Sequence, residues 1–83
     1  MLDYSFFYDL SSYLNEHWNG SFTEKEVAQN AKSYFYDFQY SKENKTVSAD
    51  IQILIDGLKE DLKNDCNSKS GNYLKQLQIA LGM

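Results

Sequence analysis

The chain has 83 residues and carries twelve acidic and eight basic side chains, a net charge of −4. A chain of this length buries only roughly 60% of the surface that its unfolded form exposes, which allows one core and excludes a deep substrate cleft beside it. Its single cysteine, Cys66, excludes an internal disulfide and favours a reducing, cytoplasmic location. The segment Met1–Phe7 lacks the pattern of a signal peptide, and no apolar run approaches the ~20 residues of a membrane-spanning helix.

Apolar side chains recur about every 3.6 residues along nearly the whole chain, which predicts an all-α fold. The first predicted helix covers about residues 3–18, with Asp3 where a negative charge suits the helix dipole. Asn19 and Gly20 end it, because glycine readily adopts the left-handed conformation. The residues predicted to share its core face are Phe6, Leu10, Tyr13, Leu14, His17 and Trp18.

The second predicted helix covers about residues 24–41 and has the clearest start signal in the chain. Thr23 and Glu26 form a capping box, in which each side chain bonds the backbone N–H of the other residue. Phe22 and Val27 flank it at the positions of a hydrophobic staple. The predicted core residues of this helix are Val27, Ala31, Tyr34, Phe35 and Phe38.

Two further helices are predicted, at about residues 49–65 and 72–81, separated by a loop at 67–71. Ser48 caps the first of them, Asp50 lies in its first turn, and Gly82 ends the second. Short connections predict a compact bundle of four helices that forms a single domain over residues 1–83. The predicted core residues of the two helices are Ile51, Leu54, Ile55, Leu58, Leu62, Tyr73, Leu74, Leu77, Ala80 and Leu81.

No motif indicates an enzyme, a metal or a cofactor. Cys66 and His17 are the one conceivable nucleophile and base pair, but a helix C-terminus and Asp65 both disfavour a thiolate. His17 lies on the predicted apolar face, where a core or boundary histidine is the usual explanation. The chain has no metal-ligand motif and no phosphate-binding loop. We therefore expect no catalytic residue, no cofactor and no metal.

A DNA-binding regulator is the disfavoured alternative. The Thr23–Ala28 segment and a later helix start at Thr46–Ser48 loosely resemble helix-turn-helix spacing, but the gap between the two helices is too long. The would-be recognition helix is also acidic, and DNA phosphates bind lysine and arginine. Arginine is absent from the chain, and that helix opens with Asp50 and then carries Asp56, Glu60 and Asp61.

Aromatic residues make up 16% of the chain, and seven of them are tyrosines, more than the predicted core faces accommodate. Tyr36 and Tyr40 lie one helical turn apart with Asp37 between them, and Tyr4 and Tyr8 repeat this spacing in the first helix. Two interpretations stay open: tyrosines at the edge of a small core, or rigid amphipathic anchors of a protein-binding surface. The second makes Tyr36, Asp37 and Tyr40 the first candidate contact surface, and Tyr4 and Tyr8 the second.

In size, acidity and tyrosine content the chain resembles small helical immunity and inhibitor proteins of bacteria, although no motif supports a closer assignment. Its lysine-, asparagine- and tyrosine-rich composition is typical of a low-GC bacterium or of its phages and plasmids. The leading hypothesis is a non-enzymatic adaptor or inhibitor that binds another, basic protein. The alternatives are a self-associating structural protein that forms a homodimer, and the DNA-binding regulator.

Overall fold

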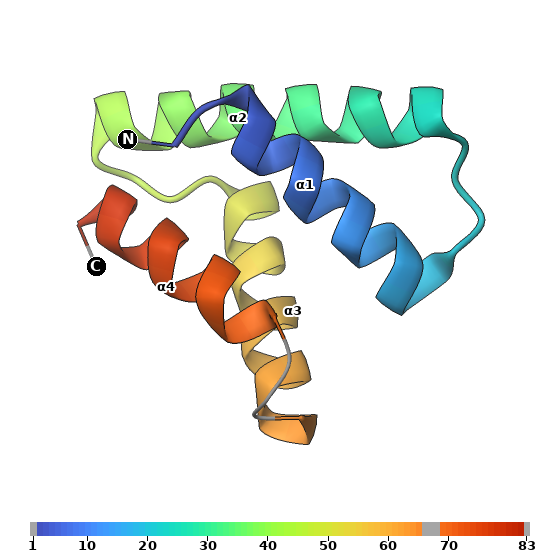
Figure 1. Cartoon of the computed structure of the whole chain (residues 1–83). Coiled ribbons are helices and arrows are strands. Elements are labelled where there is room, and N and C mark those ends of the chain that lie inside the picture. The colour runs from blue at the N-terminus through green and yellow to red at the C-terminus, as the bar shows by residue number, and fades with distance from the viewer. Residues whose placement is uncertain (1, 66–68, 83) are drawn as a thin grey trace. The chain divides into compact units, whose positions relative to one another are not determined.

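The computed structural model describes residues 2–65 and 69–82, and these are helical almost throughout (Figure 1). The described residues contain no strand, which confirms the all-α class. Four α-helices were predicted and four are observed in the described residues. Their bounds lie within three residues of the predicted ones except at the end of the first helix, which was predicted near residue 18 and lies at Leu14, where a π-helical turn follows. In chain order the elements are α1 (Tyr4–Leu14), a π-helical turn η1 (Asn15–Asn19), α2 (Glu24–Asn44), α3 (Ala49–Asn64) and α4 (Ser70–Leu81).

The chain divides into two compact units, residues 1–36 and 37–83, and the boundary falls inside α2. Each unit has its own set of buried apolar side chains. The prediction of a single domain over residues 1–83 therefore stays a prediction.

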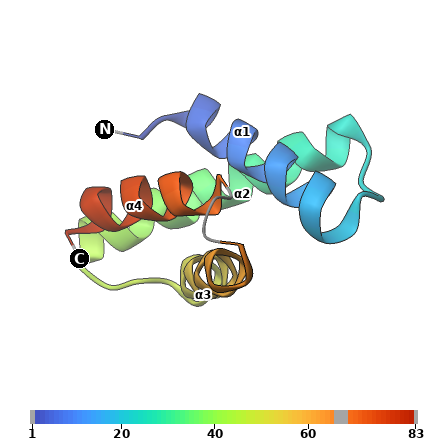
Figure 2. The ribbon, with the colours of Figure 1, turned by 60° about the horizontal axis from the view of Figure 1, so that its bottom comes forward.

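In the N-terminal unit, α1 packs across the first part of α2 (Figures 1 and 2). The rings of Phe7 and Phe35 lie 5.9 Å apart, and the Tyr4 ring meets Phe35 edge-on at 6.4 Å. Phe7 and Leu10 are completely buried, and each contributes about 2 kcal/mol through the apolar surface that it removes from water. The other buried apolar residues of this unit are Tyr13, Leu14, Val27 and Ala31.

The core face of α1 begins at Phe7, whereas Phe6 was predicted. Phe7, Leu10 and Leu14 follow the i, i+3, i+7 spacing of one helix face, while Phe6 is half-buried beside them. The sequence offers two adjacent phenylalanines that both fit a helical period, and the contact with Phe35 places Phe7 inside. Tyr34 and Phe35 were also predicted to lie in the core and are half-buried.

The capping box at the start of α2 is confirmed. The Thr23 backbone N–H donates to the Glu26 carboxylate at 3.1 Å, and the Glu26 backbone N–H donates to the Thr23 hydroxyl at 3.2 Å. At the start of α1, the Phe6 backbone N–H donates to the Asp3 carboxylate at 3.1 Å. Both starts satisfy N–H groups that a helix terminus leaves without a partner.

In the C-terminal unit, α3 and α4 pack against each other. Ser48 caps α3 as predicted, accepting from the Ile51 N–H at 3.3 Å, and its own N–H donates to the buried Ser41 hydroxyl at 2.9 Å. This second bond fixes the end of α2 to the start of α3. The buried apolar side chains of the unit are Phe38, Ile51, Leu54, Ile55, Leu58, Leu74 and Leu77, while Leu62, Tyr73, Ala80 and Leu81 are half-buried.

The start of α4 differs from the prediction, because Ser70 and Gly71 belong to the helix and not to the loop. The Ser70 side chain is completely buried and its hydroxyl donates to the Asp61 carboxylate of α3. A Cβ at Gly71 would lie 3.1 Å from a methyl group of Leu62, so glycine permits the close approach of the two helices. Packing between helices thus outweighs the low helix propensity of these residues. Asn67 and Ser68 lie outside the described residues.

Replacing Thr23 by alanine should lower the free energy of unfolding by about 1 kcal/mol, because it removes the hydroxyl that accepts from the Glu26 N–H. Urea denaturation of the wild type and the variant measures this difference. The control is Thr23→Ser, which keeps the hydroxyl and should stay close to the wild type. Equal losses in both variants would show that the hydroxyl does not cap the helix.

Candidate functional site

The two tyrosines predicted to form the first contact surface are among the most exposed large side chains described. Tyr36 is 57% exposed and Tyr40 is 59% exposed, one helical turn apart on α2. The Tyr36 ring also stacks on the neighbouring Phe35, with 6.3 Å between the ring centroids. Exposure leaves both rings accessible to another protein, and their part in binding stays a prediction.

Asp37, which lies between these tyrosines in the sequence, is half-buried and interacts with Asp50 in the first turn of α3. Burial raises the pKa of the Asp37 carboxyl above its usual value, and a hydrogen bond with Asp50 and the charge of Asp50 raise it further. The folded protein thus favours the protonated form of Asp37 more than an isolated aspartate would. Asp37, the third residue of the first predicted contact surface, is therefore half-buried and contacts α3, and its part in binding stays a prediction.

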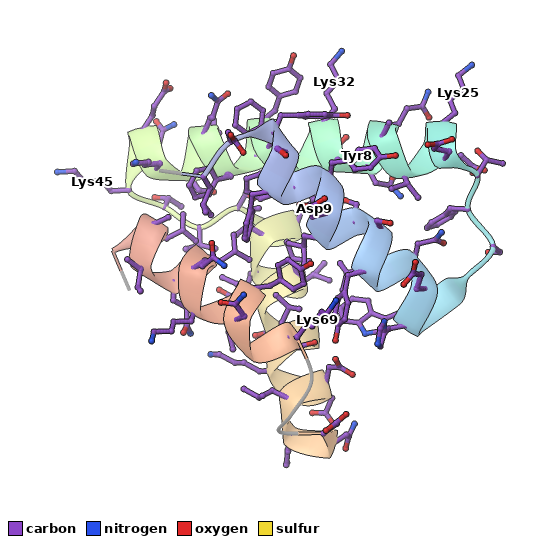
Figure 3. All side chains as sticks on the ribbon, in the orientation of Figure 1. Tyr8, Asp9, Lys25, Lys32, Lys45 and Lys69 are labelled. Carbon is purple, nitrogen blue, oxygen red and sulfur yellow. The ribbon has the colours of Figure 1, made fainter. Side chains whose placement is uncertain are left out.

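Tyr4 and Tyr8 lie where α1 meets α2 in the N-terminal unit. The Tyr4 hydroxyl donates to the Ala28 carbonyl oxygen at 3.4 Å, and the Tyr8 hydroxyl donates to the Glu24 carboxylate at 3.5 Å. Figure 3 shows Tyr8 extending from α1 towards α2. Partial burial, and then the negative charge of Glu24, raise the pKa of the Tyr8 phenol. Both hydroxyls therefore connect the two helices.

The π-helical turn η1 changes the direction of two side chains that were predicted to face the core. A π-helix has more residues per turn than an α-helix, so the 3.6-residue spacing that holds through Leu14 does not extend beyond it. His17 is exposed, with its ring 4.1 Å from that of Tyr13, and Trp18 is 46% exposed. The prediction of His17 as a core or boundary residue and of Trp18 as a core residue is therefore wrong.

The segment after η1 is held by Asn15 and Gly20. Gly20 has a φ of 72°, the left-handed conformation predicted for it, and its N–H donates to the Asn15 carbonyl oxygen. The Asn15 side chain then bonds Phe22 twice: its carboxamide accepts from the Phe22 N–H at 3.1 Å and donates to the Phe22 carbonyl at 3.3 Å. These bonds fix Phe22 relative to η1.

A pocket of about 270 Å³ lies between these elements, entirely within the N-terminal unit. Two of its lining residues, Trp18 and Phe22, are strongly exposed, at 46% and 40%. Because single waters occupy about 30 Å³ each in the liquid, a pocket of this volume is much larger than a packing defect. We call it the aromatic pocket; it is lined by Ser11, Leu14, Asn15, Trp18, Phe22, Asn30 and Tyr34.

Ser11 is an unusual component of this pocket. The residue is only 5% exposed, and its hydroxyl oxygen is buried without a hydrogen-bond partner among the described residues. A buried polar group in this state is rare in folded proteins and destabilises the fold by about 1–3 kcal/mol. Because this oxygen is buried, its cost falls on the stability of the fold.

The N-terminal unit holds most of the net charge of the chain. Residues 1–36 contain five carboxylates and two lysines, a net charge of −3 of the total of −4. The lysines, Lys25 and Lys32, extend from α2 away from α1 (Figure 3). Glu16 precedes Trp18 in η1, and Glu26 lies one helical turn before Asn30. The aromatic pocket therefore lies in an acidic unit and has no basic side chain in its wall.

Of the two groups considered for catalysis, only His17 lies within the described residues. The His17 ring nitrogen Nδ1 lies 3.1 Å from the Tyr13 carbonyl oxygen, to which it donates. Cys66 lies outside the described residues. Within residues 2–65 and 69–82 no group of three or more histidine, cysteine or carboxylate side chains could hold a metal ion. No helix in the described part of the chain has both the length and the apolar character needed to cross a membrane.

Sequence reasoning did not find the aromatic pocket. Phe22 was assigned to a staple with Val27, Trp18 to the core, and Asn15 and Asn30 to no role. One signal in the sequence could have indicated that Trp18 is exposed: it directly precedes Asn19 and Gly20, which end the helix. Side chains in the last turn of a helix can point away from its core face. The π-helical winding that brings Trp18 to the pocket has no pattern in the sequence.

Replacing Ser11 by alanine should raise the free energy of unfolding by about 1 kcal/mol, because it removes a buried hydroxyl that has no hydrogen-bond partner in the described part of the chain. Denaturation in urea measures the change. Ser33→Ala, at an exposed position of α2, is the matched control for the higher helix propensity of alanine. A gain no larger than that of the control would show that the Ser11 hydroxyl is satisfied in solution.

Replacing Asp37 by asparagine should stabilise the protein at pH 7 and lose this advantage in acid. The raised pKa means that the folded state favours the protonated Asp37, so its contribution to stability is present at low pH and is lost as the pH rises through the folded-state pKa. Melting temperatures of the wild type and Asp37→Asn, taken between pH 3 and pH 7 (roughly the range over which carboxyl groups titrate), test this. The prediction is wrong if the variant is the less stable protein at pH 7.

Comparison with known proteins adds no further assignment. No protein-family model matches the chain, and neither a curated protein nor a solved structure matches it. The site is therefore characterised by its own geometry: an aromatic pocket of about 270 Å³ in the acidic unit of the chain.

Proposed function

We propose that the chain is a non-enzymatic protein-binding module, an adaptor or an inhibitor, that binds a basic partner through the aromatic pocket. The observation that supports this most directly is the exposure of Trp18 and Phe22 on the wall of one pocket. Large aromatic side chains at the surface are costly to leave in water, and they are enriched among the residues that dominate protein interfaces.

The size of the pocket favours one inserted side chain over a separate small molecule. Its volume of about 270 Å³ lies below the range of about 300–1,000 Å³ that is usual for sites of drug-sized ligands. Side chains that act as anchors at interfaces fill pockets of this kind, while the surrounding surface excludes water. A protein partner thus accounts for both the pocket and the exposed rings beside it.

Charge favours a basic partner over a second copy of the chain. A symmetric dimer places the same surface on both sides of its interface. A dimer formed through the pocket would therefore bring together two N-terminal units that each carry a net charge of −3. A basic partner instead gains attraction and a faster encounter. We therefore rank the homodimer below the adaptor or inhibitor, and the DNA-binding regulator below both, because phosphate repels an acidic surface.

Tyr36 and Tyr40 form a second proposed contact surface on α2, since both are more than half exposed. The cytoplasmic location and the origin in a low-GC bacterium or its mobile elements belong to the same proposal, and they come from composition. They determine which cell lysate is the first place to look for the partner.

The test is chemical cross-linking and capture from a low-GC bacterial lysate, with identification by mass spectrometry. The wild type is compared with Trp18→Ala and with the double variant Tyr36→Ala/Tyr40→Ala. Ile53→Ala is the control, because Ile53 is an apolar side chain of α3 that is 67% exposed and lies outside the pocket. Circular dichroism first establishes that every variant is folded.

We expect one basic protein to be captured by the wild type and by Ile53→Ala, and its recovery to fall at least tenfold with Trp18→Ala, since an anchor residue of an interface contributes about 2 kcal/mol or more. Loss with the tyrosine double variant alone would move the contact surface to α2. A protein retained by all variants, or no protein at all, would contradict binding through the pocket.

A further inference from the structure

We propose that the outer face of α2 binds the same face of a second copy of the chain, with the two helices antiparallel. The proposed dimer goes beyond the proposed function, because it needs no other protein and uses a different surface. None of the residues of this face lines the aromatic pocket, so the dimer does not bury the pocket wall.

Six side chains define the outer face. α2 is one continuous helix over Glu24–Asn44, and positions that alternate four and three residues apart share one side of a helix. All six side chains are exposed, whereas the buried Val27, Ala31 and Phe38 lie on the opposite side. The same spacing forms the seam along which two helices pair in coiled coils. The residues of the outer face are Lys25, Gln29, Lys32, Tyr36, Gln39 and Glu43.

This face differs in charge from the chain as a whole. Its two lysines and one glutamate give it a net charge of +1, whereas the chain carries −4. Lys25 and Lys32 extend from α2 away from α1 (Figure 3). In the described part of the chain Lys25, Lys32 and Glu43 make no ion pair or hydrogen bond, so a second copy can pair with them. Charges are screened beyond about 8 Å at physiological salt, so those on the face itself matter most.

The order of the side chains makes the face complementary to itself in one orientation. In an antiparallel pair whose two-fold axis passes at position 34, each side chain lies opposite one that is equally far from the axis. The opposed residues are then Lys25 with Glu43, Gln29 with Gln39 and Lys32 with Tyr36. Because the dimer is symmetric, it makes each of these contacts twice.

Each opposed pair is chemically matched. Lys25 meets a carboxylate of the opposite charge, and the two carboxamides can donate to each other and accept from each other. The apolar stem of Lys32 gives the exposed Tyr36 ring a surface to pack against. A parallel pair would instead place each lysine against the same lysine, which charge repulsion disfavours.

The dimer is tested by sedimentation velocity of the full chain. Six side chains per copy are fewer than the roughly 20–30 residues a side of a standard interface, so we expect a reversible, weak dimer. Measurements at concentrations up to about 1 mM therefore cover the range in which it forms.

Exchanging the opposed charges tests the pairing itself. Lys25→Glu and Glu43→Lys should each weaken the dimer about tenfold, because each replaces two attractions by two repulsions. The double variant Lys25→Glu/Glu43→Lys forms both ion pairs again and should return to within about twofold of the wild type. Lys42→Glu, at an exposed position of α2 outside the face, is the matched control and should stay close to the wild type.

Two properties of these variants make the result specific. Glu43→Lys changes the net charge from −4 to −2, so general repulsion alone would strengthen self-association, whereas the proposed pairing weakens it. Both single substitutions also suit the helix dipole, since they place an acid near the start of α2 and a base near its end. Circular dichroism establishes that every variant is folded.

A wild type that stays monomeric at every concentration would overturn the proposal. A dimer that Glu43→Lys leaves unchanged or strengthens would overturn it too, as would a double variant that fails to recover. None of these measurements involves Trp18 or a captured protein, so failure of the dimer is distinguishable from failure of the proposed function.

Discussion

The paired hydrogen bonds between the Asn15 side chain and the backbone of Phe22 are the constraint on which the N-terminal unit depends. They hold the connecting segment against the end of η1, and this position determines where the capping box starts α2. The same bonds hold Phe22 at the wall of the pocket. One carboxamide thus determines both how two helices are joined and where an exposed ring lies.

The fold was largely predictable because its signals are local. The capping box at Thr23 and Glu26, the cap at Ser48 and the glycine at position 20 each depend on residues within one or two turns. The choice between Phe6 and Phe7, and the inclusion of Gly71 in α4, depend instead on contacts with distant residues such as Phe35 and Leu62. A periodic pattern contains no information about such contacts.

The candidate site was predictable only in part. Exposed tyrosines on α2 follow from a surplus of aromatic residues over core positions, whereas the aromatic pocket requires the π-helical winding of η1. The structure also contains two arrangements that do not favour stability, the unsatisfied Ser11 hydroxyl and the neighbouring carboxyls of Asp37 and Asp50. Natural proteins retain such arrangements most often where binding or regulation benefits from them.

The π-helical turn has a consequence for how this chain can change over generations. Because η1 follows Leu14, the last buried residue of α1, an insertion or deletion within the turn rotates Trp18 without altering the face that Phe7, Leu10 and Leu14 bury. The composition of the proposed binding surface can therefore change while the core keeps its packing. Under the proposed function, such changes would let the chain follow a partner that itself evolves.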